Sequence, residues 1–581
     1  MSKLKAFTKK CVCLGIVGAV LLTLSLASCA TTTTTQTPTP TPTLTPTPTV
    51  SSPSPTPTAT TPPKEKIIRQ TNSWPCVLDP GVANDLTGST VALNLYDSLL
   101  WPNPDGSVKE CLATKWEVAP DNVTYTFTLR QGVKFHNGDI MTADDVVFTM
   151  QRLLTMQKGY AYLFTTTVAE ISAPDQGTVK IVLKKPFGPF LGTLARLYVL
   201  DKKQVMANIK TGGSYGEFGD YGQEWLVTHD AGSGPYMVKE MRTEEYLLAE
   251  RFPGWWFGWT DNPDAPDFFK EINASEPVTI KTLMSRRELE ISDQWQTAES
   301  FVELAKINGV EIGSTYAGSS AYFMMNTKKA PTDDLHFRRA LSYCMDYDQI
   351  LKLFPGSKKL IGPVGSITPG HTNDLPTFSL DLEKAKTELA QSTYADQLDQ
   401  YPIDILWNTD VPDQEKAALI LAQNATAVGI KVNVVKAKWI QIVDMVSKID
   451  STPNLTFISV APHFAEAGSM LEAKYHSRSK GTWEQAEWLE DPKMDQMIDD
   501  ALATVDQTAR FQKYADIQKY AVDLCPSIFL FEWADRMAYQ AAYVDFPAVN
   551  ASKKGELVNP VLGYVYFFAD FKVFPDKVPA P

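Results

Sequence analysis

A continuous tract of threonine and proline, residues 30–63, divides this 581-residue chain into two very unequal parts. The tract carries no charged side chain and hardly any large apolar one, so it cannot bury a core, and its prolines favour an extended chain. At about 3 Å per residue it could span up to roughly 100 Å. We therefore expect residues 29–64 to form a disordered tether and the folded part to begin near residue 65.

The segment before the tract has the pattern of an export signal. Four lysines lie within residues 1–10, residues 11–27 are almost wholly apolar, and small residues close the run. The ending Leu26-Ala27-Ser28-Cys29 resembles the lipobox of bacterial lipoproteins, in which the signal, here residues 1–28, is removed and the cysteine is acylated. A transmembrane anchor is the alternative, because the apolar run is nearly long enough to span a bilayer. Both interpretations place the remainder outside the cytoplasm, and the first anchors it to the membrane by lipid on Cys29.

Charge and cysteine content narrow what the exported part can be. The formal net charge of −13 becomes −17 once the four lysines of the signal are removed. Such an acidic protein is a poor partner for nucleic acid or an anionic membrane surface. About 515 residues follow the tether, too many for one core, so two or three domains are expected. Four cysteines are too few for a disulfide scaffold; a Cys344–Cys525 bridge, a Cys76–Cys111 bridge and four free thiols all remain open.

Hydrophobic patterns along the chain indicate mixed α and β structure. Residues 123–130 alternate as a strand with one buried face does, and Thr142 with Asp145 forms a capping pair before an apolar helix. Residues 403–434 have the pattern of a strand, a helix closed by Gly429, and a second strand, a βαβ unit that implies a parallel pair. Further elements are expected as a helix over 333–353, a helix over 491–503 capped by Asp491, a helix over about 505–523 and a buried strand over 528–531.

No sequence motif indicates catalysis or a bound metal. The chain has no P-loop and no HExxH pattern. A GxSxG match at residues 212–216 has polar, Gly-rich flanks in place of the buried strand and helix that a nucleophile elbow needs. His463 and His476 are the closest histidine pair and have no cysteine nearby, so a zinc site is not expected. We therefore predict a protein without enzymatic activity, cofactor or metal.

A series of short motifs, in this order and spacing, closely resembles the large substrate-binding proteins of peptide and nickel ABC importers. The resemblance covers nearly the whole chain after the tether, and any one motif alone would be weak evidence. The motifs are Leu78-Asp79-Pro80, residues 94–99, Leu112-Ala113-Thr114-Lys115-Trp116-Glu117, residues 124–130, residues 132–138, residues 142–146, Gly232-Ser233-Gly234-Pro235-Tyr236, residues 337–341 with Asp346, and Val428-Gly429-Ile430.

The resemblance implies an α/β, two-lobed periplasmic-binding-protein fold of type II, in the large class with an extra domain in the first lobe. A hinge would let the lobes close on a solute, which a membrane permease with separate ATPase subunits would then receive. The protein is expected to act as a monomer. The implied boundaries are 65–97, 200–316 and 531–581 for lobe I, 98–199 for its extra domain, and 317–530 for lobe II.

Peptide binders of this family hold the amino end of the peptide with an aspartate, in a Trp-rich segment of the second lobe. The matching stretch here, residues 457–466, has no aspartate, and Glu466 is the substitute that it offers. His463 in the same stretch supports a nickel chelate as an alternative ligand, and Trp74 supports an oligosaccharide, because aromatic rings stack on sugars. A sensory binding protein without a transport role is a further alternative. The expected ligand-binding residues are Trp74, Tyr322, Trp439, Pro462, His463 and Glu466.

Overall fold

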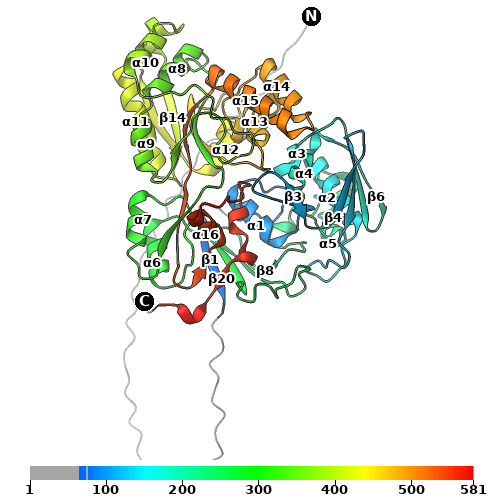
Figure 1. The fold of residues 1–581 in the computed structure, drawn as a ribbon. Coiled ribbons are helices and arrows are strands. Elements are labelled where there is room, and N and C mark those ends of the chain that lie inside the picture. The colour runs from blue at the N-terminus through cyan, green and yellow to red at the C-terminus, as the bar shows by residue number, and fades with distance from the viewer. Residues whose placement is uncertain (1–64, 73–75, 580–581) are drawn as a thin grey trace, which may run out of the picture. The chain divides into compact units, whose positions relative to one another are not determined.

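The structure, a computed structural model, describes residues 65–72 and 76–579 of the chain. The predicted signal and tether, Cys29 and Trp74 therefore lie outside the described residues. Three sheets of four or more strands organise the rest, and short two-stranded pairs connect or extend them. In Figure 1 these sheets and their helices can be followed by label and colour.

The first sheet combines the first described strand with strands from the middle of the chain. Its strand order is β1-β10-β9-β8, and β1 pairs parallel with β10 while the other pairs are antiparallel. Buried Ile68, Leu247 and Phe269 place the sheet in one core together with helix α1, Leu86–Leu95. The strands are β1 (Ile67–Asn72), β8 (Tyr236–Arg242), β9 (Tyr246–Arg251) and β10 (Phe268–Asn273).

The second sheet is antiparallel, in the order β4-β5-β7-β6, and α2 (Ala143–Met156) packs against it. The predicted strand over 123–130 is observed as β5, whose Tyr125, Phe127 and Leu129 are buried. The predicted cap is also confirmed, because Thr142 and Asp145 form a reciprocal capping box at the start of α2. The strands are β4 (Ala113–Val118), β5 (Thr124–Leu129), β6 (Val168–Asp175) and β7 (Thr178–Leu183).

The third sheet has six strands in the order β13-β17-β12-β16-β14-β15. The predicted βαβ unit is confirmed, because β14 and β15 pair in parallel and α11 (Asp413–Ala427) connects them. Residues of β17 are buried along its whole length, as expected for a strand in the interior of a sheet. The strands are β12 (Ser320–Met325), β13 (Lys358–Lys359), β14 (Ile403–Asn408), β15 (Val432–Ala437), β16 (Leu455–Val460) and β17 (Ser527–Glu532).

One helix prediction needs correction. The stretch expected as a single helix over 333–353 forms two, α8 (Leu335–Cys344) and α9 (Tyr347–Leu353). Met345 between them is extended, and the side chain of Asp346 accepts a hydrogen bond from the backbone N–H of Gln349. A new N-cap therefore starts the second helix, which the continuous apolar pattern concealed.

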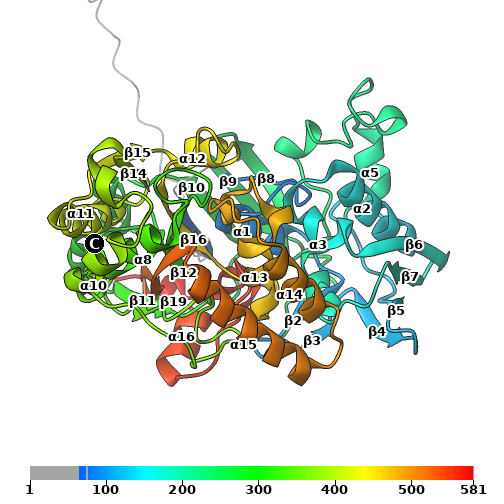
Figure 2. The ribbon, with the colours of Figure 1, turned by 90° about the horizontal axis from the view of Figure 1, so that it is seen from above.

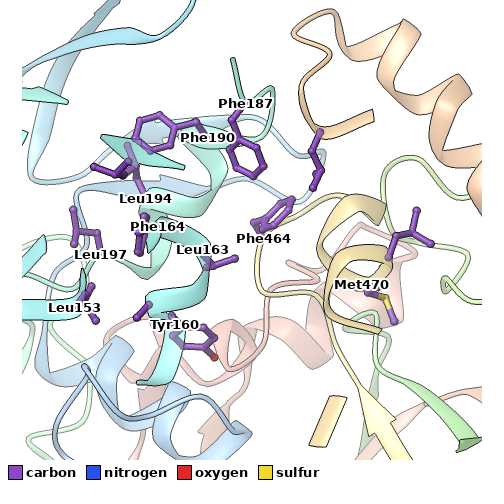
Figure 3. Packing of buried hydrophobic residues seen from close by; sticks show 14 of the residues in the cluster. Leu153, Tyr160, Leu163, Phe164, Phe187, Phe190, Leu194, Leu197, Phe464 and Met470 are labelled. Carbon is purple, nitrogen blue, oxygen red and sulfur yellow. The ribbon is translucent and has the colours of Figure 1, made fainter. Parts of the chain in front are cut away.

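Three helices near the end of the chain cover the side of the third sheet that faces the second sheet. They are α13 (Ala467–Tyr475), α14 (Pro492–Leu502, capped by Asp491 as predicted) and α15 (Gln507–Leu524). We call the second sheet together with α2, α3 (Tyr162–Thr165) and α4 (Phe190–Thr193) the second-sheet region. Figures 1 and 2 both show the three helices beside α3, and the backbone N–H of Gly188 donates to the carbonyl of Leu502 across the contact. Figure 3 shows the apolar side of this contact, where Phe464 lies between the two groups of helices.

The remaining elements connect these units. β11 pairs with β18, and single bridges at Ile291 join that pair to β1. All four described cysteines are free thiols, so neither disulfide considered above is formed. Searching the described residues reveals no helix with both the length and the apolar character needed to cross a bilayer. Remaining bounds are β2 (Leu100–Pro102), β3 (Val108–Glu110), β11 (Glu311–Thr315), β18 (Asp535–Tyr539), β19 (Val544–Asp545), β20 (Lys572–Val573), α4 (Phe190–Thr193), α5 (Lys202–Ala207), α6 (Pro277–Ser285), α7 (Ala298–Leu304), α10 (Leu382–Leu389), α12 (Trp439–Val446) and α16 (Pro547–Lys554).

Candidate functional site

A pocket whose volume of about 850 Å³ includes space open to solvent lies between the third sheet and segments that adjoin the first sheet. One wall comes from the third sheet, through the ends of β14 and β16 and the start of α12. The opposite wall comes from the start of α1, the segment after Ile291 and the start of β18. The lining includes Leu86, Gln294, Trp295, Asp535, Leu562 and Val565 on one side, and Asn408, Val411, Trp439, Phe457, Ser459 and Trp483 on the other. We call it the tryptophan pocket.

Three half-buried tryptophans give this pocket its character. Trp439 and Trp483 pack edge to face, with ring centroids 5.3 Å apart, on the third-sheet side. Trp295 lies on the opposite wall and packs edge to face against Trp533, 5.5 Å away. Large aromatic faces on both walls favour a solute with an apolar or planar part, because such contacts bury much area with few rotatable bonds.

Two described residues that line the pocket, Asp85 and Asp535, have acidic side chains. Asp535 is 4% exposed, and its Oδ1 accepts a hydrogen bond of 3.2 Å from Gln294 Nε2. Burial raises the pKa of Asp535 from its ordinary value to about 7, although a backbone hydrogen bond from Ala317 acts in the opposite direction. Asp85 caps α1 by accepting from the backbone N–H of Gly88. The pocket therefore combines apolar walls with carboxylates.

Two further acids, Asp293 and Glu271, are buried and do not line the pocket. Burial raises the pKa of Asp293 to about 7 and that of Glu271 to about 8. Both carboxylates, together with Asp535, act electrostatically on Tyr566, whose pKa is raised above its ordinary value mainly by burial. Glu271 hydrogen-bonds the side-chain amide of Asn72. Because these pKa values lie at or above neutral pH, neither acid is fully ionised at pH 7.

The structure separates the predicted binding residues into two groups. Trp439 lines the tryptophan pocket. Pro462 lies next to its rim, where its carbonyl accepts from the backbone N–H of Leu562 and its ring packs close to Gly318. Tyr322 is fully buried in β12, its hydroxyl donates to the carbonyl of Pro363 at 2.7 Å, and it does not line the pocket.

His463 is 1% exposed and takes part in packing between the second-sheet region and the third. Its Nε2 lies 2.6 Å from Glu484 Oε1, and its carbonyl accepts a 2.9 Å hydrogen bond from Arg196 Nε. The imidazole packs against the ring of Tyr160, at 5.1 Å between centroids. The structure thus gives His463 a carboxylate partner and places it away from the residues that line the pocket.

Glu466 forms a two-pronged ion pair with Arg510. The carboxylate accepts from Arg510 Nε at 2.9 Å and from Nη2 at 2.6 Å, and Tyr514 Oη donates to it at 3.2 Å. Both partners have almost fully buried side chains. Arg510 therefore supplies a countercharge to the carboxylate that the sequence suggested for the amino end of a peptide.

Sequence reasoning missed Trp295, Trp483 and Asp535. Asp535 begins β18, a few residues after the end of the buried strand β17. The chain was expected to return to the first lobe at this point, near residue 531. An acid at such a crossing was the available signal. No comparable signal distinguished Trp295 and Trp483 from the other tryptophans, because they meet only in the folded chain.

The architecture and the pocket between sheets define a two-lobed α/β binding protein of the type II periplasmic class, with an extra domain in the first lobe. Solved structures support this fold. The Helicobacter pylori periplasmic binding protein DppA in complex with the peptide STSA superposes with a TM-score of 0.75 at 18% identity, over 87% of this chain and 98% of that one. Campylobacter jejuni NikZ in complex with Ni(L-His) gives 0.74 at 17% identity, over 88% and 100%.

Residues 107–482 match the middle region of the bacterial extracellular solute-binding proteins, family 5. The chain therefore belongs to this family. The probable D,D-dipeptide-binding periplasmic protein DdpA of Escherichia coli (strain K12) is 28% identical over 518 residues, which cover 87% of this chain and 93% of that protein. The dipeptide-binding protein of the same organism is 24% identical over 488 residues, covering 78% and 84%.

Proposed function

We propose that this protein captures short peptides outside the cytoplasm and delivers them to the permease of an ABC importer. The observation that carries the proposal is the tryptophan pocket, because one wall comes from the third sheet and the other from the start of α1, the segment after Ile291 and the start of β18. A solute held there would be enclosed when the two lobes close about their hinge and would leave water. The names of the two Escherichia coli relatives support a peptide as the solute.

The proposal includes how the protein is attached and divided. The lipobox-like ending at Cys29 supports a lipid anchor there, with residues 30–63 as the tether. ATP hydrolysis would belong to separate subunits, and the protein would act as a monomer that binds peptides without turning them over. The proposed boundaries are 65–97, 200–316 and 531–581 for lobe I, 98–199 for its extra domain, and 317–530 for lobe II.

An oligosaccharide is the second candidate solute, and the observation that favours it is the aromatic lining. Trp295 and the Trp439–Trp483 pair offer ring faces on both walls, and sugar rings stack on such faces. The nickel-chelate alternative has less support, because His463, the residue that suggested it, already contacts Glu484.

Native mass spectrometry on purified residues 64–581, followed by denaturation, tests the proposal. We expect a population carrying extra mass that resolves into short peptides after denaturation. A Trp439→Ala variant should lose most of that population. A Trp225→Ala variant serves as the matched control, because Trp225 stacks on His229 and does not line the pocket. A carried sugar would instead support the second candidate, and release of shortened peptides from an added peptide would contradict binding without turnover.

A further inference from the structure

The acidic lining of the tryptophan pocket has no basic counterpart. Among the described residues that line it, Asp85 and Asp535 carry acidic side chains, and none is lysine, arginine or histidine. Asp85 already serves as the N-cap of α1. Asp535 caps no helix, and it is the second carboxylate of the pocket.

The hydrogen-bond partners of Asp535 among the described residues are neutral. They are the side-chain amide of Gln294 and the backbone of Ala317. Several other buried carboxylates of this chain face a cation directly, whereas Asp293 and Glu271 also have neutral partners but do not line the pocket. Asp79 accepts two hydrogen bonds from Arg152, at 2.8 and 2.6 Å, and Glu487 lies 2.8 Å from the buried Lys474. A buried carboxylate without a cation is costly, because it loses hydration that two neutral donors replace only in part.

We propose that the solute of this pocket carries an ammonium group that binds Asp535, and an apolar or aromatic body held between Trp295 and the Trp439–Trp483 pair. The inference rests on the proposed function and deepens it by naming the charge of the solute and the residue that recognises it. The ammonium would supply the positive charge that the protein partners of Asp535 lack, and its hydrogen bonds to the carboxylate would be charge-assisted. Asp535 is thereby assigned a specificity-determining role on the first-lobe side of the cleft.

The same lining also disfavours an anionic group on the solute. Arg536 is the nearest basic residue in sequence, but successive side chains of a strand point to opposite faces. Arg536 lines a neighbouring pocket, where its guanidinium lies 4.7 Å from the ring centroid of Phe301. A carboxylate inside the tryptophan pocket would therefore face Asp535 without a base to offset it. A peptide bound here is expected to insert its amino end and to keep its carboxyl end outside.

Isothermal titration with three forms of one dipeptide tests this inference. The probes are phenylalanyl-phenylalanine amide, which has one positive charge, the free dipeptide, which is a zwitterion, and the N-acetylated amide, which is neutral. We expect the amide to bind at least tenfold more tightly than the neutral form, and the zwitterion to bind no more tightly than the amide. In Asp535→Asn the preference for the amide over the neutral form should fall to threefold or less.

Glu271→Gln is the matched control, because Glu271 is a buried carboxylate on the same side of the molecule that does not line the pocket. It should keep the tenfold preference. Equal affinity for the amide and the neutral form, or a preference that survives Asp535→Asn, would overturn the inference while leaving peptide capture intact. If none of the three probes binds and native mass spectrometry finds no peptide, the proposed function and the inference fail together. Thermal unfolding of each variant checks that it is folded.

Discussion

Two regions of this protein treat buried charge in opposite ways. The first is the junction between the second-sheet region and the third sheet, where Glu466 faces Arg510 and His463 faces Glu484. The second is the tryptophan pocket, where Asp535 has only neutral partners. In the junction, countercharges and hydrogen bonds are supplied by the fold itself. In the pocket, the proposed countercharge comes from the solute. A buried acid that pairs with a protein cation therefore stabilises the fold, whereas one without such a partner can bind a solute.

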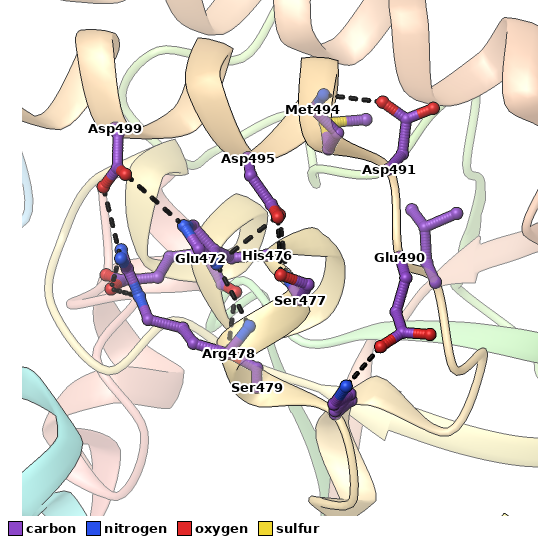
Figure 4. A network of polar contacts seen from close by, with 12 residues as sticks. Glu472, His476, Ser477, Arg478, Ser479, Glu490, Asp491, Met494, Asp495 and Asp499 are labelled. Carbon is purple, nitrogen blue, oxygen red and sulfur yellow. Dashed lines mark hydrogen bonds and ion pairs between the residues drawn. The ribbon is translucent and has the colours of Figure 1, made fainter.

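Pairing extends beyond the junction into the neighbouring helices. Figure 4 shows Arg478 between Glu472 and Asp499, with Nη2 and Nη1 at 2.7 and 3.2 Å from the respective carboxylates. His476 lies beside Asp495 and Asp499 in the same network. This network connects α13 and α14 at several points. A single exposed ion pair in it contributes little to the stability of the fold, whereas breaking a buried pair is strongly destabilising.

The largest effect is expected from breaking the buried pair at Glu466. Arg510→Met leaves that carboxylate almost fully buried without its cation, and we expect a loss of about 3–5 kcal/mol in the free energy of unfolding. Urea denaturation at pH 7.5 measures it. Adding Glu466→Gln to Arg510→Met should recover most of the loss, because no charge is then left unpaired. A single variant with wild-type stability would mean that the junction is not held by its charges.

A smaller effect concerns the pH dependence of stability without solute. The folded pKa of Asp535, about 7, lies above the unfolded value of 3.8, so the folded state binds the extra proton between these values. Stability from this group is therefore full below about pH 4 and falls as the pH rises, by at most about 1.4 kcal/mol per pH unit, until it levels off above pH 7.

Asp293 and Glu271 titrate near the same pH and lie around the same tyrosine, so the wild-type curve contains all three groups. Asp535→Asn isolates one of them. Urea denaturation at pH 5, 6, 7 and 8 should give a shallower decline for the variant and a stability at pH 8 no lower than that of the wild type. A variant that is less stable at pH 8 would show that the ionised carboxylate supports the fold, as Glu466 does.

The sequence was informative where structure follows from local pattern. The capping box at Thr142 and the βαβ unit over 403–434 depend on residues within one or two elements, and both were predictable. The break at Met345 was not, because the apolar pattern continues through it. The family resemblance supplied the two-lobed arrangement that no local pattern contains.

The binding site was harder to predict, because the partners of the candidate polar residues are distant in sequence. Glu466 and Arg510 are 44 residues apart, and His463 and Glu484 are 21 apart, so no spacing rule connects them. Gln294 and Asp535 are 241 residues apart, which hid the carboxylate of the pocket as well. His463 and Glu466 were selected because they lie in the stretch 457–466 that matches the peptide-binding segment of the family, and the structure shows that each already contacts a charged side chain.

Among the pocket residues, the tryptophans should affect affinity without much effect on stability. Trp483→Ala removes one face of the Trp439–Trp483 pair, and we expect about a tenfold loss of affinity for the amide probe, equivalent to about 1.4 kcal/mol. Titration calorimetry measures it, with Trp225→Ala as the control. An equal loss of affinity in Trp225→Ala would show that truncating any tryptophan perturbs binding. The tryptophan pocket would then not be identified as the binding site.

The smallest effect on affinity is expected at Tyr322, which was predicted from the sequence as a binding residue and is buried in the structure. Tyr322→Phe removes the hydroxyl that donates to Pro363, and leaving that carbonyl unpaired should cost about 1–2 kcal/mol of unfolding free energy. The ring remains beneath Lys474 Nζ, 3.8 Å from its centroid, so the cation–π contact is kept. Affinity for the amide probe should stay within twofold of the wild type. Asp535→Asn should show the reverse pattern, with affinity lost and stability kept, because its carboxylate serves the solute and the Tyr322 hydroxyl serves the core. If Tyr322→Phe weakens binding and leaves stability unchanged, the Tyr322 hydroxyl contributes to solute binding although it does not line the pocket.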